Sequence, residues 1–98
     1  MTLELLTIDM FNDKISQAFV VEEAESPQIE LTLIEAKALR NFANAPRAPF
    51  SLVFTSQGDF VLPQRMYPLR HPVLGLQSVF LVPIRKDGDK VSYEAVFN

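Results

Sequence analysis

Short runs in which apolar residues occupy every second position are the feature of this sequence that most restricts its fold. Phe50, Leu52 and Phe54 alternate with the residues between them, and residues 91–97 place Val, Tyr, Ala and Phe on one side. Side chains repeat every two residues along a strand and about every 3.6 residues along a helix. The spacing therefore predicts strands that are each buried on one face.

Similar runs recur along most of the chain, at residues 19–22, 29–36, 60–63, 67–70 and 79–85. Residues 86–90 lie between the last two runs and indicate a hairpin turn, since they contain Asp-Gly, whose residues accept a positive φ. Short strands at this spacing are typical of antiparallel β structure. We expect a mainly β fold, a small antiparallel β-barrel or sandwich of six to seven strands.

The N-terminal segment has a different pattern and predicts a short helix within residues 1–16. Thr7 is the expected N-cap and Asp9 lies in the first turn, where the helix dipole favours an anion. Met10, Phe11 and Ile15 then form an apolar face that can cover one end of a sheet or barrel. We expect the helix and the strands together to form a single globular domain spanning residues 1–98.

Composition excludes several kinds of chemistry. The 98 residues include no Cys and one His, so the sequence offers no thiol nucleophile and no zinc-binding cluster. We expect neither a metal nor a cofactor. No segment resembles a secretory signal or a membrane-spanning helix, which predicts a cytoplasmic protein that does not insert in a membrane.

Charge is distributed unevenly along the chain. Residues 1–46 contain 8 acidic and 3 basic residues, whereas residues 47–98 contain 4 acidic and 6 basic ones, for a net charge of −3. Nucleic-acid binding requires a dense basic surface, so no nucleic acid is expected as a partner. The asymmetry favours a protein partner or self-association through oppositely charged regions.

One set of polar residues is a candidate binding site because its members lie near proline-marked bends. Arginine side chains recognise carboxylates and phosphates, so a cluster at one open end of a barrel would bind a small anionic ligand. The alternative is that these residues have structural or solvated roles. The candidates are Arg47, Gln64, Arg65, Tyr67, Arg70 and His71.

Several phrases of the sequence together resemble a bacterial family of single-domain proteins of about 100 residues, labelled a domain of unknown function. The phrases cover nearly the whole chain, and RAPFSLVF and YEAVFN are the most specific. The resemblance implies a structural or accessory role in a phage-tail-like or surface assembly, and it names no catalytic residues. The chain departs from the family pattern at Ser16, where glycine is more usual. The phrases are residues 7–20, 47–54, 62–64, 67–72, 80–83 and 93–98.

Three functions remain open from the sequence. The first is a non-catalytic structural or interaction module, which the absence of a catalytic motif and the Phe-rich alternating strands favour. The second is a small-ligand-binding β-barrel that recognises an anionic group. The third is a hydrolase-like enzyme that uses His71 as a general base, although no nucleophile motif accompanies it.

Overall fold

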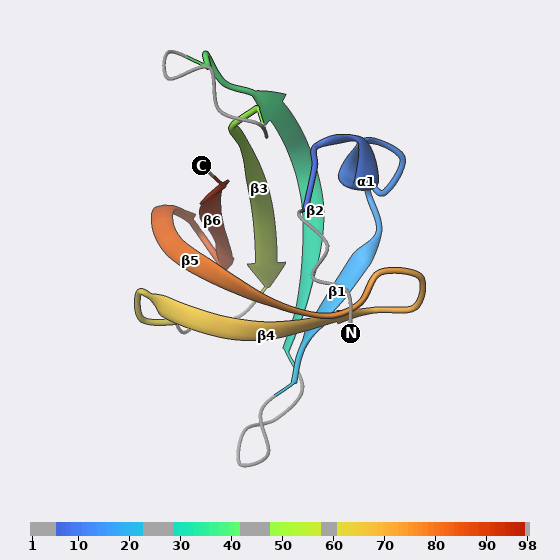
Figure 1. Cartoon of the computed structure of the whole chain (residues 1–98). Helices are drawn as coiled ribbons and strands as arrows, with labels where there is room; N and C mark the ends of the chain where they lie inside the picture. Colours follow the sequence, from blue (N-terminus) through green and yellow to red (C-terminus); the bar gives the residue numbers. More distant parts are fainter. Residues whose placement is uncertain (1–5, 23–28, 42–47, 58–60, 98) are drawn as a thin grey trace.

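The computed structural model describes residues 6–22, 29–41, 48–57 and 61–97. These residues form one helical turn and six strands (Figure 1). The elements are α1 (Asp9–Asn12), β1 (Ala18–Val21), β2 (Ile29–Ala38), β3 (Phe50–Gln57), β4 (Arg65–His71), β5 (Gly75–Asp87) and β6 (Lys90–Phe97).

The strands pair in the order β1-β2-β3-β6-β5-β4 and close into a barrel. Every neighbouring pair is antiparallel, and the contact between β1 and β4 completes the circle through Val20 opposite Arg70 and Val21 opposite Leu69. The mainly β prediction is therefore confirmed, and of the two architectures left open the chain forms a barrel. Closure gives every strand a neighbour on both sides, so no strand is a free edge along its whole length, as the edge strands of a sandwich would be.

Alternating side chains of all six strands fill the interior of the barrel. In β3, Phe50, Leu52 and Phe54 are fully buried, and in β6 the buried residues are Val91, Tyr93 and Ala95. This pattern is the one that the sequence predicts, because residues two apart in a strand share a face.

The α1 turn covers one end of the barrel, beside β1 and β2 (Figure 1). Phe11 is 2% exposed, and its ring centroid lies 6.3 Å from that of Phe19, 5.9 Å from that of Phe50 and 6.2 Å from that of Phe97. The predicted apolar face is thus confirmed at Phe11, whose side chain closes the core at this end.

The helix is shorter than expected and is capped differently. It contains one turn, its N-cap position is Ile8, and no side chain caps it, so the prediction of a Thr7 cap is wrong. The helix ends at Asn12 with Asp13 at its C-cap, and the chain takes a left-handed conformation at Ser16, where φ is +74°, before β1 begins. The Ser16 N–H donates to the carbonyl of Leu33 at 2.7 Å, which fastens this segment to β2.

The strand predicted at residues 60–63 is not observed among its described residues, whereas the hairpin turn predicted at residues 86–90 is confirmed. Residues 61–63 form no strand, and Phe60 lies outside the described residues. In the β5–β6 hairpin Asp87 pairs with Lys90, so Gly88 and Asp89 are the two turn residues within the predicted segment. Gly88 has φ +61°, the conformation that favours glycine at the start of a two-residue hairpin turn.

Candidate functional site

The described residues of the predicted anion-binding cluster do not come together. Arg65 begins β4 and His71 ends it, so the length of a seven-residue strand, about 20 Å at 3.3 Å per residue, separates their backbones. Gln64 lies beside Arg65 at the same end of the strand, and Tyr67 points into the core. Arg47 lies outside the described residues.

His71 is buried and its ring is held on both sides. Nδ1 accepts the backbone N–H groups of Val73 at 3.1 Å and Leu74 at 3.3 Å, which shapes the turn between β4 and β5. Nε2 lies 2.6 Å from Oε1 of Gln17. Because Nδ1 accepts, Nε2 carries the proton and donates it to Gln17. The arrangement requires the neutral imidazole and occupies both nitrogens.

The surroundings of His71 also favour its neutral form. Burial lowers the pKa of His71 below the ordinary value of 6.5, the positive charge of Lys14 lowers it further, and Asp13 partly opposes both effects. The hydrogen bond from Lys14 to Asp13 in turn lowers the pKa of that carboxyl group. A ring that is buried, neutral and doubly hydrogen-bonded has the contacts of a structural residue, not those of an exposed general base.

The two arginines of β4 have local partners. Arg70 donates to Glu22 at the end of β1, with its Nε 2.8 Å from the carboxylate, and this ion pair raises the pKa of Arg70. The Arg65 guanidinium lies 4.2 Å from the centroid of the Tyr67 ring and donates to the carbonyl of Met66. Both interactions tie outer side chains to the barrel wall.

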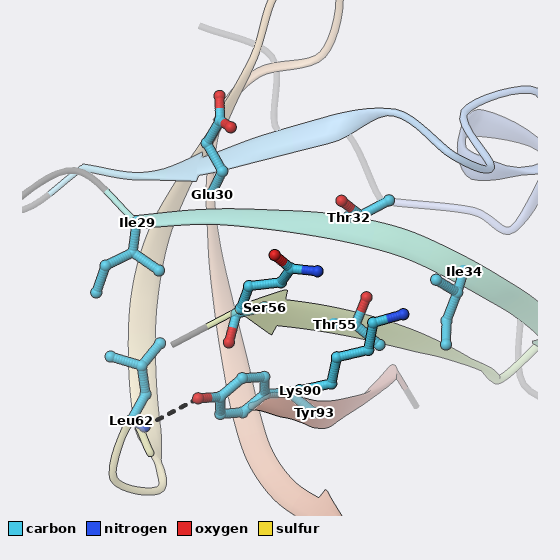
Figure 2. Close-up of a pocket in the computed structure, with 10 residues that line it drawn as sticks. Ile29, Glu30, Thr32, Ile34, Thr55, Ser56, Leu62, Lys90 and Tyr93 are labelled. Carbon is cyan, nitrogen blue, oxygen red and sulfur yellow. Dashed lines mark hydrogen bonds between the residues drawn. The ribbon is translucent and has the colours of Figure 1, made fainter. Parts of the chain in front are cut away.

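A different part of the barrel contains a pocket of about 770 Å³, which we call the β2–β3 opening. It lies where β2 and β3 separate, because their pairing stops at Thr32 opposite Thr55 and does not reach the adjoining ends of the two strands. None of the residues that line it is among the site residues predicted from the sequence. The lining residues are Ile29, Glu30, Thr32, Ile34, Thr55, Ser56, Gln57, Leu62, Lys90 and Tyr93 (Figure 2).

On the sides of β2 and β3 that face the opening, the main chain lacks ladder partners. Successive strand residues direct their N–H and C=O groups to opposite sides. The N–H of Leu33 donates to the carbonyl of Gln17 on the β1 side of β2. Glu30 lies three residues earlier, so its N–H and C=O groups face the opposite side, toward β3. Thr32 of β2 pairs with Thr55 of β3. Gln57 lies two residues after Thr55, so its N–H and C=O groups also face β2. Within the described residues no hydrogen bond satisfies these groups of Glu30 and Gln57 across the opening.

The inner side of the opening combines apolar surface with two hydroxyl groups. Tyr93 Oη accepts the N–H of Leu62 at 2.9 Å, which fixes residues 61–63 against the barrel end (Figure 2). Ser56 is 7% exposed and its side chain is directed toward the same side of β3 as Leu62 and Tyr93 (Figure 2). Among the described residues, no donor or acceptor bonds to the Ser56 hydroxyl, and no acceptor bonds to the hydroxyl hydrogen of Tyr93.

The outer rim of the opening carries one charge of each sign. Glu30 stands on β2 and its carboxylate points away from the barrel, whereas Lys90 begins β6 and its side chain runs along β3 (Figure 2). Neither residue forms an ion pair with any other described residue. The opening therefore offers main-chain groups, two hydroxyls and apolar surface, with one residue of each charge on its rim.

Other kinds of site find no support in the residues that the structure covers. Among residues 6–22, 29–41, 48–57 and 61–97, no three His, Asp or Glu side chains are grouped as metal ligands would be. In the same ranges no helix has the length and hydropathy needed to cross a membrane.

Comparisons with known proteins identify the family of the chain. Neither curated proteins nor solved structures give a significant match. The model of one family, described as a domain of unknown function (DUF6916), matches residues 6–97, which is nearly the whole chain and includes every strand of the barrel. The resemblance noted in the sequence is thereby confirmed as a single-domain family of about 100 residues, and the chain belongs to the DUF6916 family.

Proposed function

We propose that the chain is a non-catalytic interaction module that binds an extended segment of a protein partner at the β2–β3 opening. The observation that carries this proposal is the pair of main-chain edges at Glu30 and Gln57, which face each other across a pocket without ladder bonds. An unpaired strand edge is a template for another strand, because an extended peptide satisfies its N–H and C=O groups.

The dimensions and charges of the opening fit a short segment. A volume of about 770 Å³ lies within the range of about 300–1,000 Å³ that is usual for ligand pockets. A bound segment would place alternate side chains inward, toward Ser56 and Tyr93, and outward, toward the rim. Glu30 would attract a basic outward residue, and Lys90 an acidic one.

The alternative functions have less support from the geometry. Anion binding by the predicted arginine cluster would need Arg65 and His71 to lie together, and β4 holds them at opposite ends. A hydrolase-like role for His71 would need a ring nitrogen free to accept a proton. The family resemblance implies an accessory role in a larger assembly. In such a role, a module that binds a segment of a partner would join subunits.

Selection from a random peptide library displayed on phage tests the proposal directly. We expect enriched peptides to slow the hydrogen exchange of the Glu30 and Gln57 amides, measured by NMR, because bound main chain would protect both. Peptides that bind while leaving these amides unprotected, or a failure to enrich any peptide, would overturn the proposal.

A matched pair of variants separates the main chain of Gln57 from its side chain. Gln57→Pro removes an N–H that faces the opening and that no β3–β6 ladder bond uses, so we expect the barrel to fold and peptide binding to be lost. Gln57→Ala removes the side chain and keeps the N–H, so binding should persist. If Gln57→Pro fails to fold by circular dichroism, Glu30→Pro makes the same test on the other wall.

A further inference from the structure

The inner side of the β2–β3 opening has a chemistry that selects among partner segments, and the argument rests on the proposed binding of such a segment. Two hydroxyls there are nearly enclosed, Ser56 at 7% exposure and Tyr93 at 0%. They come from neighbouring strands and project from the same inner face, because Phe54 lies opposite Tyr93 and Ser56 is two residues further along β3.

Both hydroxyls have hydrogen-bonding capacity that the described residues do not use. Tyr93 Oη already accepts the N–H of Leu62 at 2.9 Å, so its own hydrogen is left to donate. The Ser56 hydroxyl has a donor and two lone pairs, and the described residues use none of them. Tyr93 is already fully buried, so a ligand that covers the opening with purely apolar atoms would newly bury the Ser56 hydroxyl unsatisfied, at about 1–3 kcal/mol, and would leave the Tyr93 hydrogen without an acceptor.

Charge excludes the strongest acceptors from this position. A carboxylate that bound here would lose its hydration and gain contact with two neutral hydroxyls only. The desolvation of one ion costs several kcal/mol. Lys90 does not compensate for this cost, because it belongs to the outer rim of the wall. An uncharged acceptor forms the same hydrogen bonds without that penalty.

We infer that the inward side chain of the bound segment is an uncharged hydrogen-bond acceptor on an apolar stem, namely the side-chain amide of Gln or Asn. Its carbonyl oxygen accepts from Tyr93, and its NH₂ group donates to Ser56. Its methylene groups pack against Ile29 and Leu62, the apolar part of the lining. The amide thus satisfies both hydroxyls at once without the desolvation cost of a carboxylate, whereas an aliphatic side chain satisfies neither.

Affinities of three otherwise identical peptides test this inference. The inward residue is Gln, Met or Glu, because Met matches the length of Gln without its amide and Glu matches its shape with a charge. We expect the Gln peptide to bind wild-type protein about tenfold more tightly than the Met peptide, equivalent to about 1.4 kcal/mol, and more tightly than the Glu peptide. The measurement is isothermal titration calorimetry at fixed salt concentration.

Ser56→Ala supplies the protein side of the comparison. It removes one hydroxyl without a change in charge, so the preference for Gln over Met should fall to threefold or less. Ser56→Thr keeps the hydroxyl and should retain the preference. Ser92→Ala, on the outer face of β6, is the control and should leave it unchanged.

The outcomes distinguish this inference from the proposal beneath it. Peptides that protect the Glu30 and Gln57 amides but bind equally with Gln and Met overturn the amide assignment and leave the segment-binding function intact. A Glu peptide that binds more tightly than the Gln peptide also overturns the assignment. If no peptide protects those amides, the segment-binding function itself fails.

Discussion

Nε2 of His71, at the end of β4, lies 2.6 Å from Oε1 of Gln17, which stands 54 residues earlier between α1 and β1. Gln17 Nε2 donates in turn to the carbonyl of Asp13 at 3.3 Å, which orients its amide so that Oε1 faces the imidazole. This bond joins the β4–β5 turn to the segment that follows the helix. It depends on a neutral, Nε2-protonated ring.

Stability should therefore fall as the pH falls below about 6.5. The pKa of His71 is lowered in the folded protein, so the unfolded chain binds a proton at a higher pH than the folded chain does. The contribution of the neutral ring is complete above pH 6.5 and is lost as the pH drops toward the folded pKa. Urea denaturation at pH 5.5 and pH 7.5 measures the difference.

His71→Asn is the control for this pH dependence. The Asn oxygen can still accept a backbone N–H in the turn, but it does not titrate, so the difference between pH 5.5 and pH 7.5 should shrink. The lowered pKa of Asp13 places that carboxyl group below this window. An equal pH dependence in wild type and His71→Asn would assign the effect to other groups.

Ser16→Gly should stabilise the protein by about 0.5–1 kcal/mol. Ser16 has φ +74°, a left-handed conformation that costs a residue with a Cβ about 1–2 kcal/mol, and glycine avoids that cost while losing more chain entropy on folding. The substitution keeps the N–H that donates to Leu33. Urea midpoints compare it with Ser16→Val, whose branched side chain should destabilise the fold, and a lower midpoint for Ser16→Gly would contradict the prediction.

Gly88→Ala should cost about 1 kcal/mol through the backbone alone. Gly88 has φ +61°, and a Cβ added there meets no atom within 4 Å, so no steric contact contributes. Gly88→Asn should cost less, since Asn tolerates the left-handed region. Thermal unfolding of both variants checks the order, and equal losses would point to an effect other than backbone conformation.

Phe11→Ala should destabilise the barrel by about 3–5 kcal/mol, the usual range for removal of a buried Phe. Its ring contacts Phe19, Phe50 and Phe97 and closes one end of the core. Phe11→Leu retains most of the apolar volume and should lose less than half as much. Urea denaturation gives both values, and a loss below about 1 kcal/mol for Phe11→Ala would show that the α1 turn is not part of the cooperative core.

The alternation of apolar residues determined most of the β structure from sequence. It located β3 and β6 to within two residues, because each strand buries one face and exposes the other. A further signal in β2 is that the inward apolar positions move from Leu31 and Leu33 to Ala36, while Ile34 is exposed. The structure has its β-bulge between Leu33 and Glu35, where one extra residue shifts the side chains to the opposite face.

Tertiary structure decided the closure of the barrel and the place of the candidate site. No local pattern shows that β1 pairs with β4, or that β2 and β3 part beyond Thr32 and Thr55, because both depend on how distant strands twist and meet. Ser56 and Gln57 are unremarkable in the sequence and acquire significance from that separation. His71 and Arg65 looked like one cluster, yet a single extended strand holds them apart. Local periodicity thus specified which residues face inward, and long-range pairing alone specified where the wall opens.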